Sequence, residues 1–283
     1  MSQIQWYPGH MAKAKRMIQE SLAVVDLVIV VLDARIPHTS YNPDFRHILG
    51  KKPQLMVLNK ADMANPAQTQ KWIAYYKSKG FGAIAMNAQK KQGVKDLLRA
   101  ASIMAEPVLL ALEAKGRNRR PVRAMVVGSP NTGKSTLINA LMPKATSKTG
   151  NKPGVTRGKQ WVRVNDKIDV LDTPGILWPK FENAEIAFAL AVTGAVSYDV
   201  YSSRDVSLEL IAKLNKFMPN PLEARYKIDC AGKTSDEILE AIGRARGMLT
   251  HGGAIVEEEV ATVLLAEFRN GKLGRFTLDE VPE

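Results

Sequence analysis

The sequence predicts an α/β protein in which a mostly parallel sheet is covered by helices on both faces and is followed by a small helical domain. Along the first 180 residues, short apolar runs of strand length alternate with longer helical patterns, which is the order of a parallel sheet with crossover helices. After about residue 200 the strand-like runs stop and amphipathic helical patterns follow. We therefore expect two domains, at residues 1–200 and 201–283.

The individual elements follow from the same patterns. The strands are nearly continuously apolar, which is typical of strands buried on both faces, and we expect them at residues 24–32, 54–59, 83–86, 123–127, 161–164 and 168–171. Helices between them are expected at residues 11–22, 66–79, 94–114, 134–141 and 184–195. The second domain is expected to hold helices at residues 206–217, 235–248 and 257–269, and the hydroxyl of Thr234 or Ser235 can cap the second of these.

Charge and composition narrow the class of partner. The net charge is +12, with +15 in residues 1–200 and −3 in residues 201–283. Such a surplus favours a polyanionic partner, most simply nucleic acid, with solubility alone as the alternative. The single cysteine, Cys230, excludes an internal disulfide and fits a reducing compartment. The sequence has no apolar run of transmembrane length and no recognisable signal peptide, so we expect a cytoplasmic protein without stable membrane insertion.

Residues Gly128–Ser135 match the G-x-x-x-x-G-K-[ST] pattern of a phosphate-binding loop, between a predicted strand and a predicted helix. The backbone N–H groups of such a loop and the N-terminus of the helix attract phosphate oxygens. Lys134 is expected to reach the β- and γ-phosphates of a nucleotide, and Ser135 is expected to bind Mg²⁺. The phosphates are further expected to contact Asn131, Thr132, Gly133 and Thr136.

A second element selects the base. Residues Asn59, Lys60, Ala61 and Asp62 match the N-K-x-D pattern and follow a predicted strand. The carboxylate of Asp62 can accept hydrogen bonds from N1–H and the 2-amino group of guanine, whereas adenine offers neither donor. Sites built to satisfy such groups discriminate by roughly 10⁴-fold or more. The sequence therefore predicts GTP rather than ATP.

A third element senses the γ-phosphate. Residues Asp172-Thr173-Pro174-Gly175 follow the last predicted strand, where an aspartate is the usual partner of Mg²⁺. The N–H of Gly175 can contact the γ-phosphate of GTP, and this contact is lost with GDP. Between this element and the phosphate loop, Thr156 is the candidate threonine that senses Mg²⁺.

These elements occur in permuted order. In most GTPases the phosphate loop comes first, but here Asn59–Asp62 precedes Gly128–Ser135, and Asp172–Gly175 comes last. The chain therefore resembles the circularly permuted GTPases and, among them, the ribosome biogenesis GTPase A family. The resemblance covers almost the whole chain through residues 6–14 (WYPGHMAKA), 32–37 (LDARIP), 42–43 (NP), 252–253 (GG) and 268–275 (FRNGKLGR).

The resemblance implies a circularly permuted Ras-like P-loop GTPase domain and a helical, RNA-binding C-terminal domain. It implies a GTP-hydrolysing switch that binds the large ribosomal subunit precursor and its rRNA and promotes late assembly. The implied ligands are GTP or GDP, Mg²⁺ and K⁺, and we expect a monomer in solution. Two alternatives stay open: a GTP-gated RNA-binding scaffold with little hydrolysis of its own, and a GTPase that acts on another RNA.

Several positions bear on the chemistry. Where the family has Ser-Ala after the third strand, this chain has Asn87-Ala88, and the N–H of Ala88 is expected to meet guanine O6. Ile176 occupies the position of the water-orienting Gln of Ras-like enzymes, so we expect slow turnover alone and stimulation by the ribosomal particle. His10 is the candidate catalytic base, with a structural role or RNA contact as the alternative. Asn131 is the candidate K⁺ ligand, with stabilisation of the loop as the alternative.

The permuted order also predicts how the nucleotide state is transmitted. The Asp172–Gly175 loop leads through one helix into the second domain, so we expect that domain's orientation to follow the nucleotide. Basic side chains that could contact rRNA gather at Lys115, Arg117, Arg119, Arg120 and Arg123, around the presumed first switch at Lys144, Lys148, Lys152, Arg157, Lys159 and Arg163, and in a stripe formed by Arg269, Lys272 and Arg275.

Overall fold

The computed structural model describes residues 8–142, 160–173 and 183–282, and it divides the chain into two compact units. Of the described residues, 8–142, 160–173 and 276–282 form a sheet unit, and 183–275 form a helical unit. These units differ from a division at residue 200 in two respects. Residues 183–200 belong to the helical unit, and the last residues of the chain return to the sheet unit.

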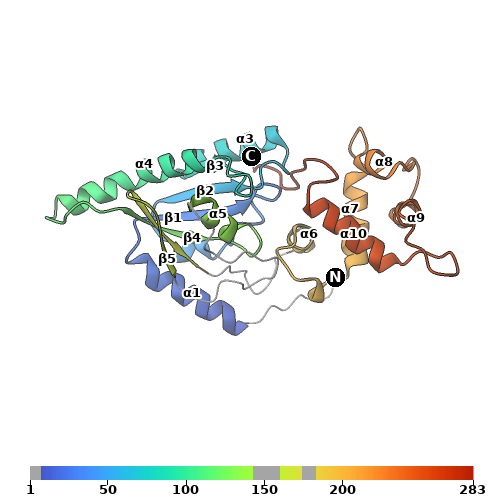
Figure 1. The fold of residues 1–283 in the computed structure, drawn as a ribbon, viewed down its shortest axis with the longest axis horizontal. Helices are drawn as coiled ribbons and strands as arrows, with labels where there is room; N and C mark the ends of the chain where they lie inside the picture. The colour runs from blue at the N-terminus through green and yellow to red at the C-terminus, as the bar shows by residue number, and fades with distance from the viewer. Residues whose placement is uncertain (1–7, 143–159, 174–182, 283) are drawn as a thin grey trace. The chain divides into compact units, whose positions relative to one another are not determined.

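The sheet unit is built on six strands in the order β3-β2-β1-β4-β6-β5 (Figure 1). Neighbouring strands pair in parallel along β3, β2, β1, β4 and β6, and the edge strand β5 pairs antiparallel to β6. The strands are β1 (Leu27–Asp33), β2 (Gln54–Asn59), β3 (Gly82–Ala85), β4 (Val122–Val127), β5 (Gln160–Asn165) and β6 (Ile168–Asp172). The carboxyl ends of the parallel strands therefore meet at one edge, which is where ligands bind in open α/β sheets.

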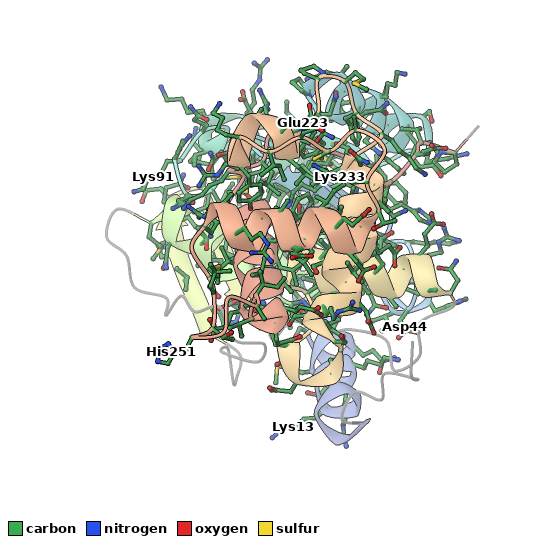
Figure 2. All side chains as sticks on the ribbon, turned by 90° about the vertical axis from the view of Figure 1, so that its right-hand side faces the viewer. Lys13, Asp44, Lys91, Glu223, Lys233 and His251 are labelled. Atoms are coloured by element: carbon green, nitrogen blue, oxygen red, sulfur yellow. The ribbon has the colours of Figure 1, made fainter. Side chains whose placement is uncertain are left out.

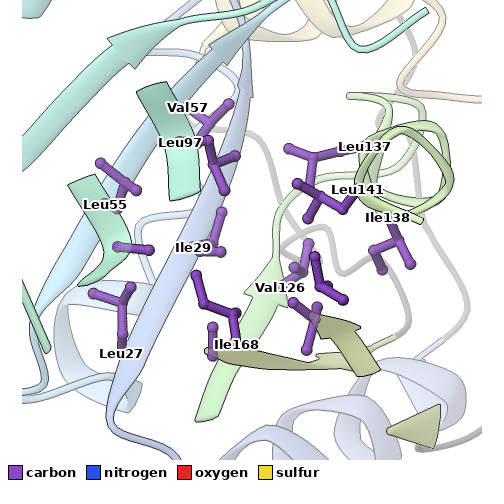
Figure 3. Packing of buried hydrophobic residues seen from close by; sticks show 14 of the residues in the cluster. Leu27, Ile29, Leu55, Val57, Leu97, Val126, Leu137, Ile138, Leu141 and Ile168 are labelled. Carbon is purple, nitrogen blue, oxygen red and sulfur yellow. The ribbon is translucent and has the colours of Figure 1, made fainter. Parts of the chain in front are cut away.

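Helices cover both faces of this sheet, as the sequence predicts. Alternate residues of the strands point to opposite faces, so β1 contributes Ile29 to one core and Val30 to the other. The first core packs against Leu97 and Leu137 (Figure 3), and the second packs against Ile18 and Trp72. The helices are α1 (Pro8–Leu22), α2 (Phe45–Ile48), α3 (Pro66–Ser78), α4 (Val94–Glu113) and α5 (Lys134–Leu141).

The helical unit contains α6 (Ala184–Thr193), the 3₁₀ turn η1 (Tyr198–Val200), α7 (Ser203–Leu214), α8 (Pro221–Tyr226), α9 (Ser235–Ala245) and α10 (Glu257–Arg269). Thr234 caps α9 as predicted, in a capping box with Glu237. His251 is exposed in the loop between α9 and α10 (Figure 2). No helix in the described ranges is long and apolar enough to cross a membrane.

Two charged side chains stabilise this unit from within. The carboxylate of Glu267 is buried and accepts hydrogen bonds from Arg225, Arg246 and the hydroxyl of Tyr226. Arg269 donates to the backbone oxygens of Ala191 and Val192 at 2.6 and 3.1 Å, so it caps the C-terminus of α6. Arg269, which the sequence places in a basic stripe, therefore has a structural role at this helix end.

Candidate nucleotide-binding site

The parallel strands bring the sequence elements together at one edge of the sheet. Asp33 at the end of β1 is the register partner of Asn59 at the end of β2. On the other side of β1, Val126 of β4 pairs with Asp172 at the end of β6. Elements separated by more than 100 residues along the chain therefore surround one position, despite their permuted order.

The phosphate-binding loop connects β4 to α5, and its shape requires glycine at two positions. Gly128 and Gly133 have φ values of 155° and 96°, which L-residues rarely adopt. A Cβ atom on Gly133 would overlap the side-chain amide of Asn59, and one on Gly128 would overlap the backbone oxygen of Val31. Helix α5 begins at Lys134, within the last residues of the loop. The loop therefore presents backbone N–H groups and a helix N-terminus to the same place, as phosphate binding requires.

Lys134 is buried within this loop. Its ammonium donates to the backbone oxygen of Ser129 at 2.8 Å, and burial lowers the pKa of Lys134 to about 8, although Asp172 acts to raise it. A buried cation is expensive unless it is paired. The site therefore favours an anionic ligand, and phosphate oxygens would supply the missing charge.

Two residues of the N-K-x-D element hold the phosphate loop in place. The side chain of Asn59 donates to the backbone oxygen of Thr132 at 2.9 Å and accepts from the N–H of Ala88 at 3.0 Å. Lys60, at a φ of 60°, donates to the backbone oxygen of Asn131 at 2.6 Å. The N-K-x-D element and the candidate phosphate-binding loop therefore form one hydrogen-bonded assembly.

The expected guanine-binding residues lie around Asp62. Its carboxylate is partly exposed and lies 3.6 Å from the ammonium of Lys90. The buried Asn87 accepts from the backbone N–H of Lys90 at 3.0 Å, while its side-chain nitrogen has no partner among the described residues. The N–H of Ala88, expected to meet guanine O6, donates to Asn59 in this structure.

A buried ion cluster behind the phosphate loop was not predicted as part of the site. The carboxylate of Asp33 accepts from Arg35 at 2.9 and 2.7 Å and from Lys60 at 3.0 Å. Burial alone would raise the pKa of Asp33, but the charges of Arg35 and Lys60 outweigh it and hold this pKa well below its usual range. The sequence contains a signal for this cluster, because the pair Asp33 and Arg35 comes at the end of an uninterrupted apolar strand.

The third element is described in part. Asp172 is buried at the end of β6, and the hydroxyl of Thr173 donates to the backbone oxygen of Val126 at 2.5 Å. Ser135 and Thr136 are half-buried in the first turn of α5. A serine hydroxyl and a carboxylate are the hard oxygen donors that Mg²⁺ prefers, so Ser135 and Asp172 fit this ion chemically. Thr156, Gly175, Ile176 and the side chain of His10 lie outside the described residues.

Comparison with known proteins decides the family. Residues 123–220 match the family model of the 50S ribosome-binding GTPases. The ribosome biogenesis GTPase A of Bacillus cereus is 45% identical over 280 residues, which cover 99% of this chain and 94% of that protein. The chain belongs to the ribosome biogenesis GTPase A family. It is therefore a GTPase.

Other relatives agree with this family and fold. The mitochondrial ribosome-associated GTPase 1 of mouse is 32% identical, with 97% of this chain and 90% of that protein covered. The crystal structure of GNP-bound YlqF from Thermotoga maritima superposes with a TM-score of 0.67 at 28% identity, covering 95% of this chain and 98% of that one. The predicted fold, a circularly permuted P-loop GTPase domain followed by a helical region, is confirmed.

Proposed function

We propose that this GTPase is a switch that binds the large ribosomal subunit precursor and promotes its late assembly. The observation that carries the proposal is near-full-length similarity to a protein named ribosome biogenesis GTPase A, joined to a matched model described as a 50S ribosome-binding GTPase. The positive charge of the chain supports an RNA-rich partner. We further propose that the protein acts in the cytoplasm as a monomer without stable membrane insertion.

The nucleotide acts through Asp172–Gly175. Mg²⁺, when bound, neutralises charge on the phosphates, and Ser135, Thr156 and Asp172 would hold it. Lys134 supplies a further positive charge to the phosphates, and the N–H of Gly175 distinguishes GTP from GDP. Because the chain runs from this loop into the helical unit, a change at the γ-phosphate is transmitted toward residues that bind the particle.

Hydrolysis needs a group that orients water, and Ile176 cannot supply it. His10 is the candidate base within the chain, and K⁺ held by Asn131 is a candidate for stabilising charge in the transition state. Turnover in KCl above that in NaCl at equal ionic strength supports the K⁺ role. Unchanged particle-stimulated turnover in His10→Ala contradicts the role of His10.

Basic surface residues support contact with rRNA. Lys13 on α1 and Lys91 after β3 are exposed on the sheet unit, and both lie at the surface in Figure 2. Arg163 is exposed on the edge strand β5 and pairs with Asp169. Contacts of such residues with phosphates make binding weaker as the salt concentration rises.

Co-sedimentation with ribosomal particles tests the proposal. Purified protein is centrifuged with large-subunit precursors, mature large subunits or small subunits, in a non-hydrolysable GTP analogue or in GDP. We expect it to sediment with large-subunit particles in the analogue and to be released in GDP. The proposal is contradicted if the protein binds small subunits as well as it binds large-subunit particles, or if its binding is the same in the GTP analogue and in GDP. Binding to the particle without stimulated hydrolysis favours a GTP-gated RNA-binding scaffold. Binding to another RNA, and not to ribosomal particles, favours a GTPase that acts on that RNA.

A further inference from the structure

The last residues of the chain leave the helical unit and form a strap across the sheet unit. This strap, residues 276–281, begins directly after Arg275, where the helical unit ends. Phe276 is buried, and Val281 packs against the second core of the sheet unit. The strap contacts two loops that are more than 200 residues away in the sequence.

The first of these loops carries the base-recognition residues. The N–H of Phe276 donates to the backbone oxygen of Met63 at 3.1 Å, and Met63 directly follows Asp62. The hydroxyl of Thr277 accepts from the N–H of Asn65 at 3.2 Å. The N–H of Met63 in turn donates to the oxygen of Lys60 at 2.9 Å. The strap therefore fixes the segment that presents the Asp62 carboxylate.

The second loop follows β1, and the strap closes on it through a carboxylate. The N–H of Leu278 donates to the backbone oxygen of Arg35 at 2.7 Å. Asp279 accepts from both the N–H and the hydroxyl of Thr39, each at 2.8 Å. Burial raises the pKa of Asp279, and the two hydrogen bonds from Thr39 act to lower it. Hydrogen bonds to a charged acceptor in such surroundings are among the strong ones.

The two loops are also joined beneath the strap. The N–H of Ala34 donates to the oxygen of Asn59 at 2.8 Å, and Asp33 binds the side chain of Lys60. The base-recognition loop is therefore held on one side by the ion cluster and on the other by the strap. Preorganised contacts of this kind raise affinity because the loop need not be ordered when the ligand binds.

We propose that the strap positions the guanine-recognition loop, with Asp279 as its positioning residue. Because the strap follows Arg275 directly, the chain connects the helical unit to the guanine-recognition loop a second time, in addition to its connection through Asp172.

Nucleotide binding by the purified chain tests the proposal without any ribosomal particle, so the outcome does not depend on the proposed role in assembly. We compare Asp279→Ala with Glu280→Ala, because Glu280 is the neighbouring carboxylate and is exposed. Dissociation constants are measured for GDP and for inosine diphosphate, which lacks the 2-amino group read by Asp62. Thr39→Val and a chain that ends at Arg275 serve as second variants. Thermal unfolding monitored by circular dichroism confirms that each variant is folded.

Asp279→Ala is expected to weaken GDP binding about tenfold, the size of effect expected when one binding loop loses its preorganisation. The affinity for inosine diphosphate should fall less, because this nucleotide makes one hydrogen bond fewer to Asp62. The preference for GDP over inosine diphosphate should therefore fall. Glu280→Ala should match the original chain. A folded Asp279→Ala or Thr39→Val variant with unchanged GDP affinity and unchanged preference overturns the proposal. An equal loss for both nucleotides also overturns it, because a loosened fold would affect both alike.

Discussion

The ion cluster at Asp33 offers the sharpest test of how the site is held together. Asp33 and Arg35 have side chains that are only 3% and 2% exposed, and Lys60 shares the same carboxylate. Asp33→Asn removes the carboxylate charge beside the buried Arg35, and breaking one partner of a buried pair costs about 3–5 kcal/mol. Because Lys60 also binds the Asn131 backbone oxygen, the loss should reach the phosphate loop and weaken GDP binding.

Asp26 provides a matched control at the opposite end of β1. It is also buried, and its carboxylate binds Arg120 at 2.7 and 2.9 Å and the N–H of Arg123 at 2.9 Å. Urea unfolding should show that Asp26→Asn and Asp33→Asn both lower the free energy of unfolding. Isothermal titration should show weaker GDP binding in Asp33→Asn alone. Equal GDP affinity in both variants refutes the argument that the cluster supports the site.

The pH dependence of stability follows from the same cluster. The pKa of Asp33 is lower in the folded chain than its unfolded value of 3.8. Its contribution to stability is therefore complete above that value and is lost as the pH falls below it. Urea unfolding of the original chain should lose stability more steeply below pH 3.8 than that of Asp33→Asn. Parallel curves contradict the stated role of Asp33.

Three further predictions concern the base, the phosphate loop and the helical unit. Asp62→Asn should weaken GDP binding at least about 100-fold. The variant should favour xanthosine diphosphate, because the amide of Asn can donate to the 2-oxo group of xanthine. A variant that still prefers GDP would show that Asp62 does not recognise the base. Gly133→Ala should weaken GDP binding. Gly80→Ala should cost only about 1 kcal/mol of stability, because Gly80 has a similar φ of 84° but a Cβ there meets no described atom within 4 Å beyond its chain neighbours. Similar GDP affinity in both variants would contradict the overlap with Asn59. Glu267→Gln should destabilise the helical unit by about 2 kcal/mol without changing GDP affinity, because a buried charged hydrogen-bond network is broken; unchanged unfolding would show that the network contributes nothing.

The sequence predicted the elements that rest on periodicity and motifs. The strand at 54–59 and the helices at 134–141 and 257–269 have the predicted bounds, because apolar patterning and flanking signals agree there. Helices α2 and α8 were not predicted, since four and six residues are too few to show a helical period. The helix predicted at 206–217 begins three residues earlier, at Ser203, because the capping serine is Ser202.

Long-range polar contacts could not be predicted in the same way. The motifs identified Asn59, Lys60 and Lys134, because these residue types recur at fixed spacing. The bonds between Asp33 and Lys60, and between Asp279 and Thr39, join residues that no local pattern relates. The bonds of Arg269 could not be predicted for the same reason, since its partners belong to another helix, α6. Charge in the sequence therefore identifies basic residues but does not distinguish those open to RNA from those that cap a helix.

The decisive measurement is the rate of GTP hydrolysis with and without ribosomal particles. We expect slow turnover by the purified chain and no rise with small subunits. With large-subunit particles we expect a rise of at least about tenfold, as trans-acting stimulation of GTPases allows. Turnover that is unaffected by large-subunit particles, or stimulated equally by both subunits, would contradict the claim that this GTPase is a switch for large-subunit assembly.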